Sequence, residues 1–485
     1  MRLAALCDDR IRLRGSGEVE ISGLALDSRA VSAGDLFAAL PGTHTDGARF
    51  IAQARAAGAV AVLGDPGTAD ATDLPALVAL EPRAALARVA ARFFGRQPRT
   101  VVAVTGTAGK SSVVTFARQL WNGLGLAAAS LGTLGLQTSD AAGEGSLTTP
   151  DPITLQRQAA GLAARGIDHL AVEASSHGLD QRRMDGLRLA AAAFTNISRD
   201  HFDYHGSAAA YYAAKRRLFA DLLPSGGVAV LNADVPEFAD LAGLAVDRRL
   251  CVLDYGERGR ALRLLARRPS AHGQELEVEL LGRRHAFATP LVGGFQASNL
   301  LAAAGLVLAA DDRVAEMLGL LGRLRAPAGR MELVARHPSG AAAFVDYAHK
   351  PEALAKALEA LRPHTTGRLT VVFGCGGDRD PGKRPLMGEI AARLADRVIV
   401  TDDNPRSEDS ALIRQAVLAA AHGAVEIGGR EEAIRATFAS LGAGDTLLVA
   451  GKGHETYQIV GERVLPFDDA LILRDAARGV GGVVA

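Results

Sequence analysis

The chain has 485 residues, in which 54 Lys and Arg balance 54 Asp and Glu, so its formal net charge is +0. This balance excludes a general attraction to nucleic acid or to an anionic membrane surface. No apolar run approaches the ~20 residues of a membrane-spanning helix, and the first residues turn acidic before a signal-peptide core forms. Because the chain is too long for a single core, we expect two or three domains.

The three cysteines, Cys7, Cys251 and Cys375, form no C-x-x-C motif. They argue against a disulfide framework or a thiolate zinc site, and they suit a cytoplasmic protein. We expect each of them to be a small buried apolar side chain.

Residues 1–97 form the first block of the chain. Short apolar runs between glycine turns predict short strands, and an Ala-rich stretch predicts a helix over about Pro82–Phe94. Gln97, Pro98 and Arg99 then mark a domain boundary.

The segment Val101–Ser112 carries the most information. Its valine-rich run predicts a buried parallel strand, which is followed by a short glycine loop, Lys110, Ser111 and a helical pattern. In such an arrangement backbone N–H groups surround an anion, the lysine adds positive charge at the phosphates, and the serine hydroxyl can bind Mg²⁺. A standard Walker A loop would have glycine at Val104, so we interpret the segment as a shorter nucleotide loop; the alternative is a plain glycine turn.

The rest of the chain alternates predicted strands and helices, which is typical of α/β proteins with parallel sheets. Strands are expected at residues 167–172, 191–194, 228–231, 342–345, 369–373, 397–400, 425–427 and 446–449. Residues 250–290 alternate apolar and polar side chains as antiparallel strands do, and residues 325–329 have the composition of a linker. The glycine-rich tail after Arg478 is expected to be loose.

Polar side chains follow several of these strands, at the edge where parallel sheets bind ligands. Glu173 and His177 follow one strand, and His201 and His205 follow the next. A carboxylate and an imidazole near bound phosphates can hold a divalent ion, so we predict a functional role for Glu173 and His201. His177 and His205 could equally be structural. By composition alone, Lys215 is predicted to be a solvated lysine on a helix surface.

Three later segments bear on a substrate. The glycine-rich segment Gly374–Asp380 fails the dinucleotide fingerprint at Arg379; its positive charge, shared with Lys383 and Arg384, suits an anionic substrate or a solvated turn. Asp403–Arg406 is a tight turn in which the Arg406 guanidinium could match a carboxylate, or in which the chain caps the helix that follows. In Gly451–Glu455 the carboxylate of Glu455 could bind an ammonium group.

In this order, these segments resemble the Mur ligase family of ATP-dependent peptidoglycan amino-acid ligases over nearly the whole chain. The resemblance rests on Asp27–Arg29, Asp46–Gly47, Gly106–Ser112, Thr148–Asp151, Glu173–Leu179, Thr195–His201, Lys215, Asn299, Gly329–Glu332, Asp346–His349, Gly374–Lys383, Asp403–Arg406 and Gly451–Glu455.

The resemblance implies three α/β domains. These are a uridine-nucleotide-binding domain (residues 1–97), a central P-loop-type ATPase domain with a parallel sheet (98–327) and a Rossmann-like amino-acid-binding domain (328–485). It also implies a cytoplasmic monomer without nucleic-acid or membrane partners. That monomer would use ATP and two Mg²⁺ ions to join meso-diaminopimelate to UDP-N-acetylmuramoyl-L-alanyl-D-glutamate through an acyl phosphate.

The family's site residues map onto this chain in four groups. The implied ATP-binding residues are Gly106, Thr107, Gly109, Lys110, Ser111, Ser112, Asn299, Arg330, Asp346 and His349. The implied Mg²⁺ ligands are Ser111, Glu173, His201 and, if it is carbamylated, Lys215; Lys110, Glu173, His201 and Lys215 are the implied catalytic residues. The UDP-muramoyl dipeptide would contact Ser28, His44, Thr148, Thr149, Ser175, Gln181 and Arg183. Diaminopimelate would contact Arg379, Asp403, Asn404, Arg406, Gly451 and Glu455.

Arg406 also bears on the choice of amino acid. Diaminopimelate has a carboxylate and an ammonium at its far end, whereas lysine has only the ammonium. A guanidinium there would attract the first and repel the second, and leaving it unpaired costs enough for a ~10²-fold preference. We therefore predict meso-diaminopimelate as the substrate.

The chain departs from the family pattern at three places. Ala108, Lys350 and Gln296 replace the usual Asn, Thr and Asn, and Ala108 removes a polar contact near the phosphates. Alternative functions are a lysine-adding ligase, a folylpolyglutamate synthetase-like ligase and a nucleotide-switched binding or motor protein. A dinucleotide oxidoreductase is disfavoured by Arg379.

Overall fold

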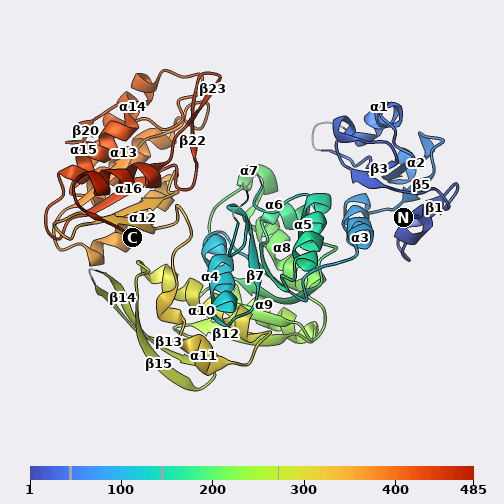
Figure 1. Cartoon of the computed structure of the whole chain (residues 1–485), viewed down its shortest axis with the longest axis horizontal. Coiled ribbons are helices and arrows are strands. Elements are labelled where there is room, and N and C mark those ends of the chain that lie inside the picture. Colours follow the sequence, from blue (N-terminus) through green and yellow to red (C-terminus); the bar gives the residue numbers. More distant parts are fainter. Residues whose placement is uncertain (43–45, 142, 144–146, 271) are drawn as a thin grey trace. The chain divides into compact units, whose positions relative to one another are not determined.

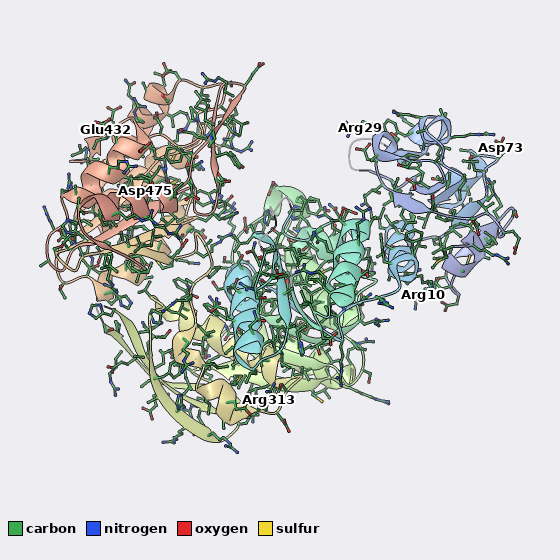
Figure 2. All side chains as sticks on the ribbon, viewed as in Figure 1. Arg10, Arg29, Asp73, Arg313, Glu432 and Asp475 are labelled. Atoms are coloured by element: carbon green, nitrogen blue, oxygen red, sulfur yellow. The ribbon has the colours of Figure 1, made fainter. Side chains whose placement is uncertain are left out.

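The computed structural model describes residues 1–42, 46–141, 143, 147–270 and 272–485. The chain forms two compact units, one of Met1–Tyr255 with Ala302–Val314 and one of Gly256–Leu301 with Ala315–Ala485. Figure 1 labels many of the elements named below and colours the chain by residue number. Exposed charged side chains lie on both units; Figure 2 labels Arg29 on the first and Glu432 on the second.

The N-terminal part of the first unit is a five-stranded sheet with the order β1-β5-β4-β3-β2. Its strands are β1 (Arg12–Arg14), β2 (Gly23–Ala25), β3 (Asp35–Ala38), β4 (Ala61–Gly64) and β5 (Ala76–Val78), of which only β1 runs antiparallel. The helices are α1 (Ile51–Ala56), α2 (Pro66–Asp70) and α3 (Pro82–Phe94). The range predicted for α3 is confirmed; Pro82 opens it and Gly95, at φ 73°, ends it.

The central part of the first unit is a largely parallel sheet. Its strands are β6 (Thr100–Thr105), β7 (Ala128–Gly132), β8 (Gly135–Gln137), β9 (His169–Glu173), β10 (Leu189–Phe194), β11 (Val228–Asn232) and β12 (Cys251–Gly256), in the order β12-β11-β10-β6-β9-β7-β8. Only the β7–β8 pair is antiparallel. The helices are α4 (Lys110–Gly123), α5 (Pro152–Ala164), α6 (Ser176–Asp180), α7 (Phe202–His205), α8 (Ala208–Arg217) and α9 (Phe238–Asp247).

The second unit begins with three antiparallel strands, β13 (Leu262–Ser270), β14 (Gly273–Leu280) and β15 (Arg283–Thr289), as predicted for residues 250–290. The start of that prediction is wrong, because β12 pairs in parallel with β11. Helix α10 (Gly294–Leu308) and helix α11 (Val314–Leu318) follow in the chain, and residues 302–314 belong to the first unit.

The C-terminal sheet has the order β20-β19-β18-β21-β17-β16-β24. Its strands are β16 (Glu332–Arg336), β17 (Ala342–Asp346), β18 (Leu369–Phe373), β19 (Arg397–Val400), β20 (Val425–Glu426), β21 (Thr446–Ala450) and β24 (Val483–Val484); a separate hairpin is β22 (Tyr457–Val460) with β23 (Arg463–Pro466). Its helices are α12 (Pro351–Leu361), α13 (Lys383–Leu394), α14 (Ser410–Leu418), α15 (Arg430–Ala439) and α16 (Asp469–Gly479).

Helices cover both faces of this C-terminal sheet. Leu358 of α12 and Met387 of α13 pack with Val371 on one face, whereas Phe438 of α15 and Leu473 of α16 pack with the opposite face. Successive side chains along each strand point to opposite faces of the sheet. Because helices bury both faces, these strands are continuous apolar runs in the sequence. The polar residues therefore collect where the strands end.

Two smaller sequence predictions are wrong. The tail after Arg478 is not loose, because β24 pairs antiparallel with β16. Cys375 is buried as expected, but Cys7 is half-buried and Cys251 is exposed. In the described ranges, no helix combines the length and the apolar character needed to cross a membrane.

Candidate active site

The glycine loop lies between the end of β6 and the start of α4. Gly106 (φ 145°) and Gly109 (φ 90°) have backbone angles that favour glycine, and a Cβ on Gly106 would collide with Oγ1 of Thr195. The same Oγ1 donates to the Ala108 carbonyl over 2.7 Å, and Asn196 Oδ1 accepts from Ala108 N over 3.1 Å. The end of β10 thus fixes the loop in front of the N-terminus of α4, an arrangement typical of an anion site.

Two lysines converge on one backbone oxygen of this loop. Lys110 Nζ donates to the Gly106 carbonyl at 2.9 Å, and Lys215 Nζ donates to the same carbonyl at 2.8 Å. In the described part of the chain, no carboxylate forms a salt bridge with Lys215. Burial, and then the nearby Lys110 ammonium, lower the pKa of Lys215 well below its ordinary value. The pair forms a site in which an added anion would be stabilised.

The prediction that Lys215 is a surface lysine is wrong. Its side chain is 1% exposed, because α8 buries the face that also carries Tyr211 and Ala214. Lys215 Nζ lies 4.5 Å from the centre of the Tyr211 ring.

Glu173 is a buried carboxylate at the end of β9, with 1% exposure. Its Oε1 accepts from Thr133 N over 3.0 Å and its Oε2 from Thr133 Oγ1 over 3.3 Å. Among the residues described, no cation pairs with it. A buried carboxylate without a cationic partner has the chemistry of a ligand for a divalent ion. The hydroxyl of Ser111, in the first turn of α4, is a second oxygen donor of the kind that Mg²⁺ prefers.

The histidines that the sequence singled out lie together. The ring of His177 lies 4.7 Å from that of His201, 5.5 Å from that of His205 and 4.1 Å from that of Tyr204. His201 has a left-handed backbone (φ 53°), which is uncommon for a residue with a side chain. Burial, followed by the charge of Arg183, lowers the pKa of His177, so its imidazole is neutral near pH 7.

The residues implied for the muramoyl dipeptide form one hydrogen-bond network around Glu173. Thr149 Oγ1 donates to the Glu173 carbonyl over 2.7 Å and lies 3.0 Å from Ser175 Oγ. Arg183 joins the network through the Thr149 carbonyl at 2.6 Å and through Gln181 Oε1. Thr148 reaches it through the hydroxyl of Thr133, 3.1 Å away. The structure therefore brings all five of these predicted residues together.

Ser28 lines a separate cavity of about 450 Å³ in the N-terminal sheet. Its hydroxyl donates to Gln53 Oε1 over 3.1 Å, and Phe37 and Phe50 supply apolar walls. Such walls beside a hydroxyl and an amide suit a nucleobase and ribose. His44, predicted to be near the same ligand, lies outside the described residues.

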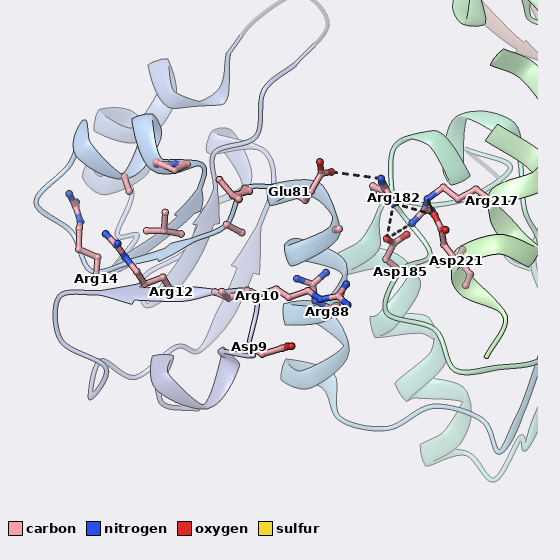
Figure 3. A pocket seen from close by; sticks show the side chains of 18 of the residues that line it. Asp9, Arg10, Arg12, Arg14, Glu81, Arg88, Arg182, Asp185, Arg217 and Asp221 are labelled. Atoms are coloured by element: carbon pink, nitrogen blue, oxygen red, sulfur yellow. Dashed lines mark hydrogen bonds and ion pairs between the residues drawn. The ribbon is translucent and has the colours of Figure 1, made fainter. Parts of the chain in front are cut away.

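A larger cavity of about 1210 Å³ lies in the first unit, and none of the predicted site residues lines it. Seven arginines and five carboxylates line it, and Arg182 and Arg217 pair there with Glu81, Asp185 and Asp221 (Figure 3). Arg217 contacts Asp185 at 2.5 Å and Asp221 at 3.1 Å, and Arg182 has three carboxylates within 3.7–3.9 Å. Such pairs account for the charges of Arg182 and Arg217 without a ligand.

In the second unit, three of the residues implied for the nucleoside, Arg330, Asp346 and His349, lie around Tyr347. The Arg330 guanidinium lies 4.7 Å from the centre of the Tyr347 ring, and His349 Nδ1 lies 2.9 Å from the Tyr347 carbonyl. Asp346 accepts from Met331 N over 2.7 Å, and burial raises the pKa of its carboxyl. Asn299, on α10, donates to Gln296 Oε1 over 3.1 Å. The departure from the family at position 296 thus keeps an amide partner for Asn299.

The loops after β19 and β21 meet around Asn404, which is 3% exposed. Asn404 Nδ2 donates to Glu455 Oε2 over 3.1 Å, and the ammonium of Lys452 contacts Asn404 Oδ1 at 3.1 Å and Glu455 Oε2 at 3.3 Å. Asp403 lies against Gly451, where a Cβ would come within 2.9 Å of Asp403 Oδ2. These residues thus form one polar cluster.

Arg406 is half-buried beside this cluster, with a left-handed backbone (φ 51°). Its Nη1 donates to the Gly377 carbonyl over 2.8 Å, which fixes the direction of the guanidinium. The turn before it is not a helix cap, because the side chain of Asp409 caps α14. The left-handed turn with a held guanidinium favours a binding role for Arg406.

The basic loop after β18 differs from the prediction. Arg384 is 7% exposed and pairs with Glu408, and Lys383 Nζ donates to the His349 carbonyl over 2.9 Å, so neither is a solvated cation. Arg379 is exposed, and its Nη1 contacts the Asp378 carbonyl at 3.2 Å.

Sequence reasoning missed Thr133, Lys452 and Arg430, each of which contacts a predicted site residue or its loop. The lysine within the Gly451–Glu455 segment was a usable signal. No local sequence pattern pointed to Thr133 or Arg430, because their roles depend on contacts between segments far apart in the chain.

Comparison with known proteins matches three regions of the chain to domains of one family. Residues 20–94 match the description "Mur ligase family, catalytic domain", residues 104–307 match "Mur ligase middle domain", and residues 329–453 match "Mur ligase, glutamate ligase domain". The chain belongs to the Mur ligase family, whose members are ATP-dependent amide ligases. The three-domain α/β architecture predicted from the resemblance is confirmed.

Relatives of this chain carry a common name. It is 54% identical to the UDP-N-acetylmuramoyl-L-alanyl-D-glutamate–2,6-diaminopimelate ligase of Bradyrhizobium diazoefficiens, over 93% of both chains. It is 53% identical to the enzyme of that name from Caulobacter vibrioides, over 95% of this chain and 96% of that one. A solved structure of a ligase with this name is 31% identical, covers 99% of both chains and has a TM-score of 0.74.

Proposed function

We propose that this protein is an ATP-dependent ligase that joins meso-diaminopimelate to the D-glutamate of UDP-N-acetylmuramoyl-L-alanyl-D-glutamate, in the synthesis of peptidoglycan precursors. The observation that carries the proposal is the convergence of Lys110 and Lys215 on the Gly106 carbonyl, beside a glycine loop built for an anion. The identity of the relatives, above 50% over nearly the full length, supports the choice of substrates.

The first step joins two anions. The side-chain carboxylate of D-glutamate attacks the γ-phosphate of ATP, giving an acyl phosphate and ADP. Lys110 and the N–H groups of the loop hold the phosphates and offset their charge. Ser111, Glu173, His201 and a carbamylated Lys215 would hold Mg²⁺, which would supply further positive charge against the repulsion of the two anions. The neutral amine that burial favours in Lys215 is the form that reacts with carbon dioxide to give a carbamate.

The second step is attack by the amine of diaminopimelate on the acyl phosphate, which releases inorganic phosphate and forms the amide. Thr149, Ser175 and Arg183 orient the muramoyl dipeptide so that its reacting carboxylate faces the phosphate loop. Ser28 and His44 hold the uridine diphosphate, and Asn299, Arg330, Asp346 and His349 hold the nucleoside of ATP.

The amino acid binds at the loops after β19 and β21. Arg406 pairs with the distal carboxylate that lysine lacks, and Asp403 and Glu455 face the distal ammonium. Arg379 contacts the other end of the amino acid. This arrangement favours diaminopimelate over lysine and argues against the lysine-adding alternative.

We keep the domain boundaries at residues 97 and 327, a cytoplasmic location and a monomeric state as parts of the proposal. The cavity at Ser28 disfavours a folylpolyglutamate synthetase-like function, because that activity needs no uridine nucleotide.

The experiment is an assay of phosphate release with ATP, Mg²⁺ and UDP-N-acetylmuramoyl-L-alanyl-D-glutamate, with the product identified by mass spectrometry. Release that depends on Mg²⁺, ATP, the UDP-muramoyl dipeptide and meso-diaminopimelate, with a tripeptide product, supports the proposal. ATP hydrolysis that proceeds without any amino acid would indicate a nucleotide-switched protein instead.

A further inference from the structure

Arg430 is a fully buried cation that none of the steps above uses. It begins α15, its side chain is 0% exposed, and it pairs with Asp469, also 0% exposed, at the start of α16. The pairing is bidentate: Nε donates to Oδ1 over 2.8 Å and Nη2 to Oδ2 over 2.7 Å. Such a fork fixes the orientation of the guanidinium.

The remaining donors of Arg430 reach two strand ends. Nη2 also donates to the Ala450 carbonyl over 3.0 Å, and Nη1 donates to the Asp402 carbonyl over 3.3 Å. Ala450 is the last residue of β21 and precedes Gly451, and Asp402 follows β19 and precedes Asp403. One side chain therefore binds the backbone immediately before each of the two amino-acid loops.

The sheet itself provides no direct tie between these strands. In the order β20-β19-β18-β21, strand β18 separates β19 from β21, so no ladder of backbone hydrogen bonds joins their ends. Arg430 spans this gap from α15. Burial lowers the pKa of Arg430, but the nearby carboxylates of Asp469, Asp403 and Glu455 more than offset this effect. The pKa of Arg430 is therefore raised.

We propose that Arg430, locked by Asp469, is a positioning residue that sets the distance between the Asp403–Arg406 turn and the Gly451–Glu455 loop, and thereby the affinity for the incoming amino acid. Arg430 acts without touching the substrate, through the carbonyls of Ala450 and Asp402. The inference rests on the proposed function, because it assigns the amino acid to these loops. Small displacements of groups that orient a substrate have large effects on rate and affinity.

The test separates positioning from stability. Removing Arg430 alone leaves a buried carboxylate and destabilises the chain, so the informative variant replaces both partners by apolar side chains, Arg430→Met with Asp469→Leu. Apolar replacement of a buried ion pair is often neutral or stabilising, but it cannot bind the two carbonyls. Arg435→Ala, on the exposed face of the same helix, is the matched control.

We expect the double variant of the full chain to keep a melting temperature close to that of the wild type and to raise KM for meso-diaminopimelate about 10-fold. KM for ATP and for the UDP-muramoyl dipeptide is expected to stay within about twofold. Arg430→Lys, which keeps the charge but loses the fork, should show the same selective rise. An unchanged KM for diaminopimelate, or an equal rise for all three substrates, would overturn the inference. If the wild type does not turn over diaminopimelate at all, the proposed function fails instead.

Discussion

At the phosphate loop, Lys110 Nζ and Lys215 Nζ both donate to the Gly106 carbonyl, whereas at the loops after β19 and β21 each buried charge has an opposite charge beside it. Arg430 pairs with Asp469, and Lys452 pairs with Glu455. Burial and the nearby cation of Lys110 disfavour a second positive charge at Lys215, and both lower its pKa well below the ordinary value. Paired charges are already compensated, and they fix geometry instead.

The difference separates two tasks within one reaction. The phosphate loop has to stabilise charge that substrates bring and that develops during phosphoryl transfer. Under the proposed function, the amino-acid loops have to choose between small molecules that differ by one carboxylate, which requires a rigid frame around a single guanidinium, Arg406. The predictions below alter one region or the other.

The largest effect is expected at the phosphate loop. Lys110→Ala removes the cation that offsets the phosphates, and we expect kcat/KM to fall roughly 10³-fold or more. Glu173→Ala should have an effect of similar size through loss of a metal ligand. Lys356→Ala, at an exposed position on α12, is the control and should behave as the wild type. Near-normal turnover in the Lys110 or Glu173 variant, with folding verified by circular dichroism, would contradict the assignment.

Selectivity is expected to change at the other region. Arg406→Ala removes the partner of the distal carboxylate, and we expect the preference for meso-diaminopimelate over L-lysine to fall about 10²-fold. The measurement is kcat/KM for each amino acid. Arg463→Ala, an exposed arginine in β23, serves as the control. If the Arg406 variant still prefers meso-diaminopimelate over L-lysine, a residue other than Arg406 determines the selectivity.

A smaller effect concerns pH. Burial, and then the charge of Arg330, lower the pKa of His454 to about 4, so its imidazole is neutral in the folded protein near pH 7. Above the unfolded pKa of about 6.5 the group contributes nothing to stability, because both states are neutral. As the pH falls from about 6.5 to about 4, the unfolded chain binds the proton first and stability falls by at most about 3 kcal/mol.

The check for this effect is the melting temperature of the wild type and of His454→Gln at about pH 7 and about pH 5. We expect a smaller drop in the variant, which lacks the titrating group. Equal drops in both proteins would show that His454 does not titrate abnormally.

The smallest expected effect is at Ala108. This residue is exposed in the phosphate loop, so Ala108→Asn restores the family's usual amide without a steric conflict. One added polar contact should lower KM for ATP about threefold, and leave KM for diaminopimelate unchanged. The measurement is the KM for ATP of the wild type and the variant, from steady-state rates over a range of ATP concentrations. A higher KM in the variant would contradict the prediction and would mean that the chain has adapted to alanine.

The local sequence pattern was enough to predict the helices and strands that carry the site residues. The valine-rich run before Gly106, the Ala-rich helix at Pro82–Phe94 and the apolar strands of the C-terminal sheet all depend on periodicity and turn chemistry within a few residues. The polar ends of strands also pointed to Glu173 and Asp403, because parallel strands end at one edge of a sheet.

Long-range packing decided what sequence could not predict. Lys215 has the composition of a surface residue, and only the packing of α8 on the phosphate loop buries it. The pairing of β24 with β16 and the bridge made by Arg430 join segments distant in the chain, which no local pattern encodes. Arg384 looked like a substrate-binding cation because its partner, Glu408, lies 24 residues away.

The most direct test of the account is a competition in one reaction. The wild-type protein is given ATP, Mg²⁺, UDP-N-acetylmuramoyl-L-alanyl-D-glutamate and equal concentrations of meso-diaminopimelate and L-lysine, and the two products are quantified by mass spectrometry. We predict that the diaminopimelate product exceeds the lysine product about 10²-fold or more. Equal amounts, or an excess of the lysine product, would contradict the role of Arg406 and the choice of substrate.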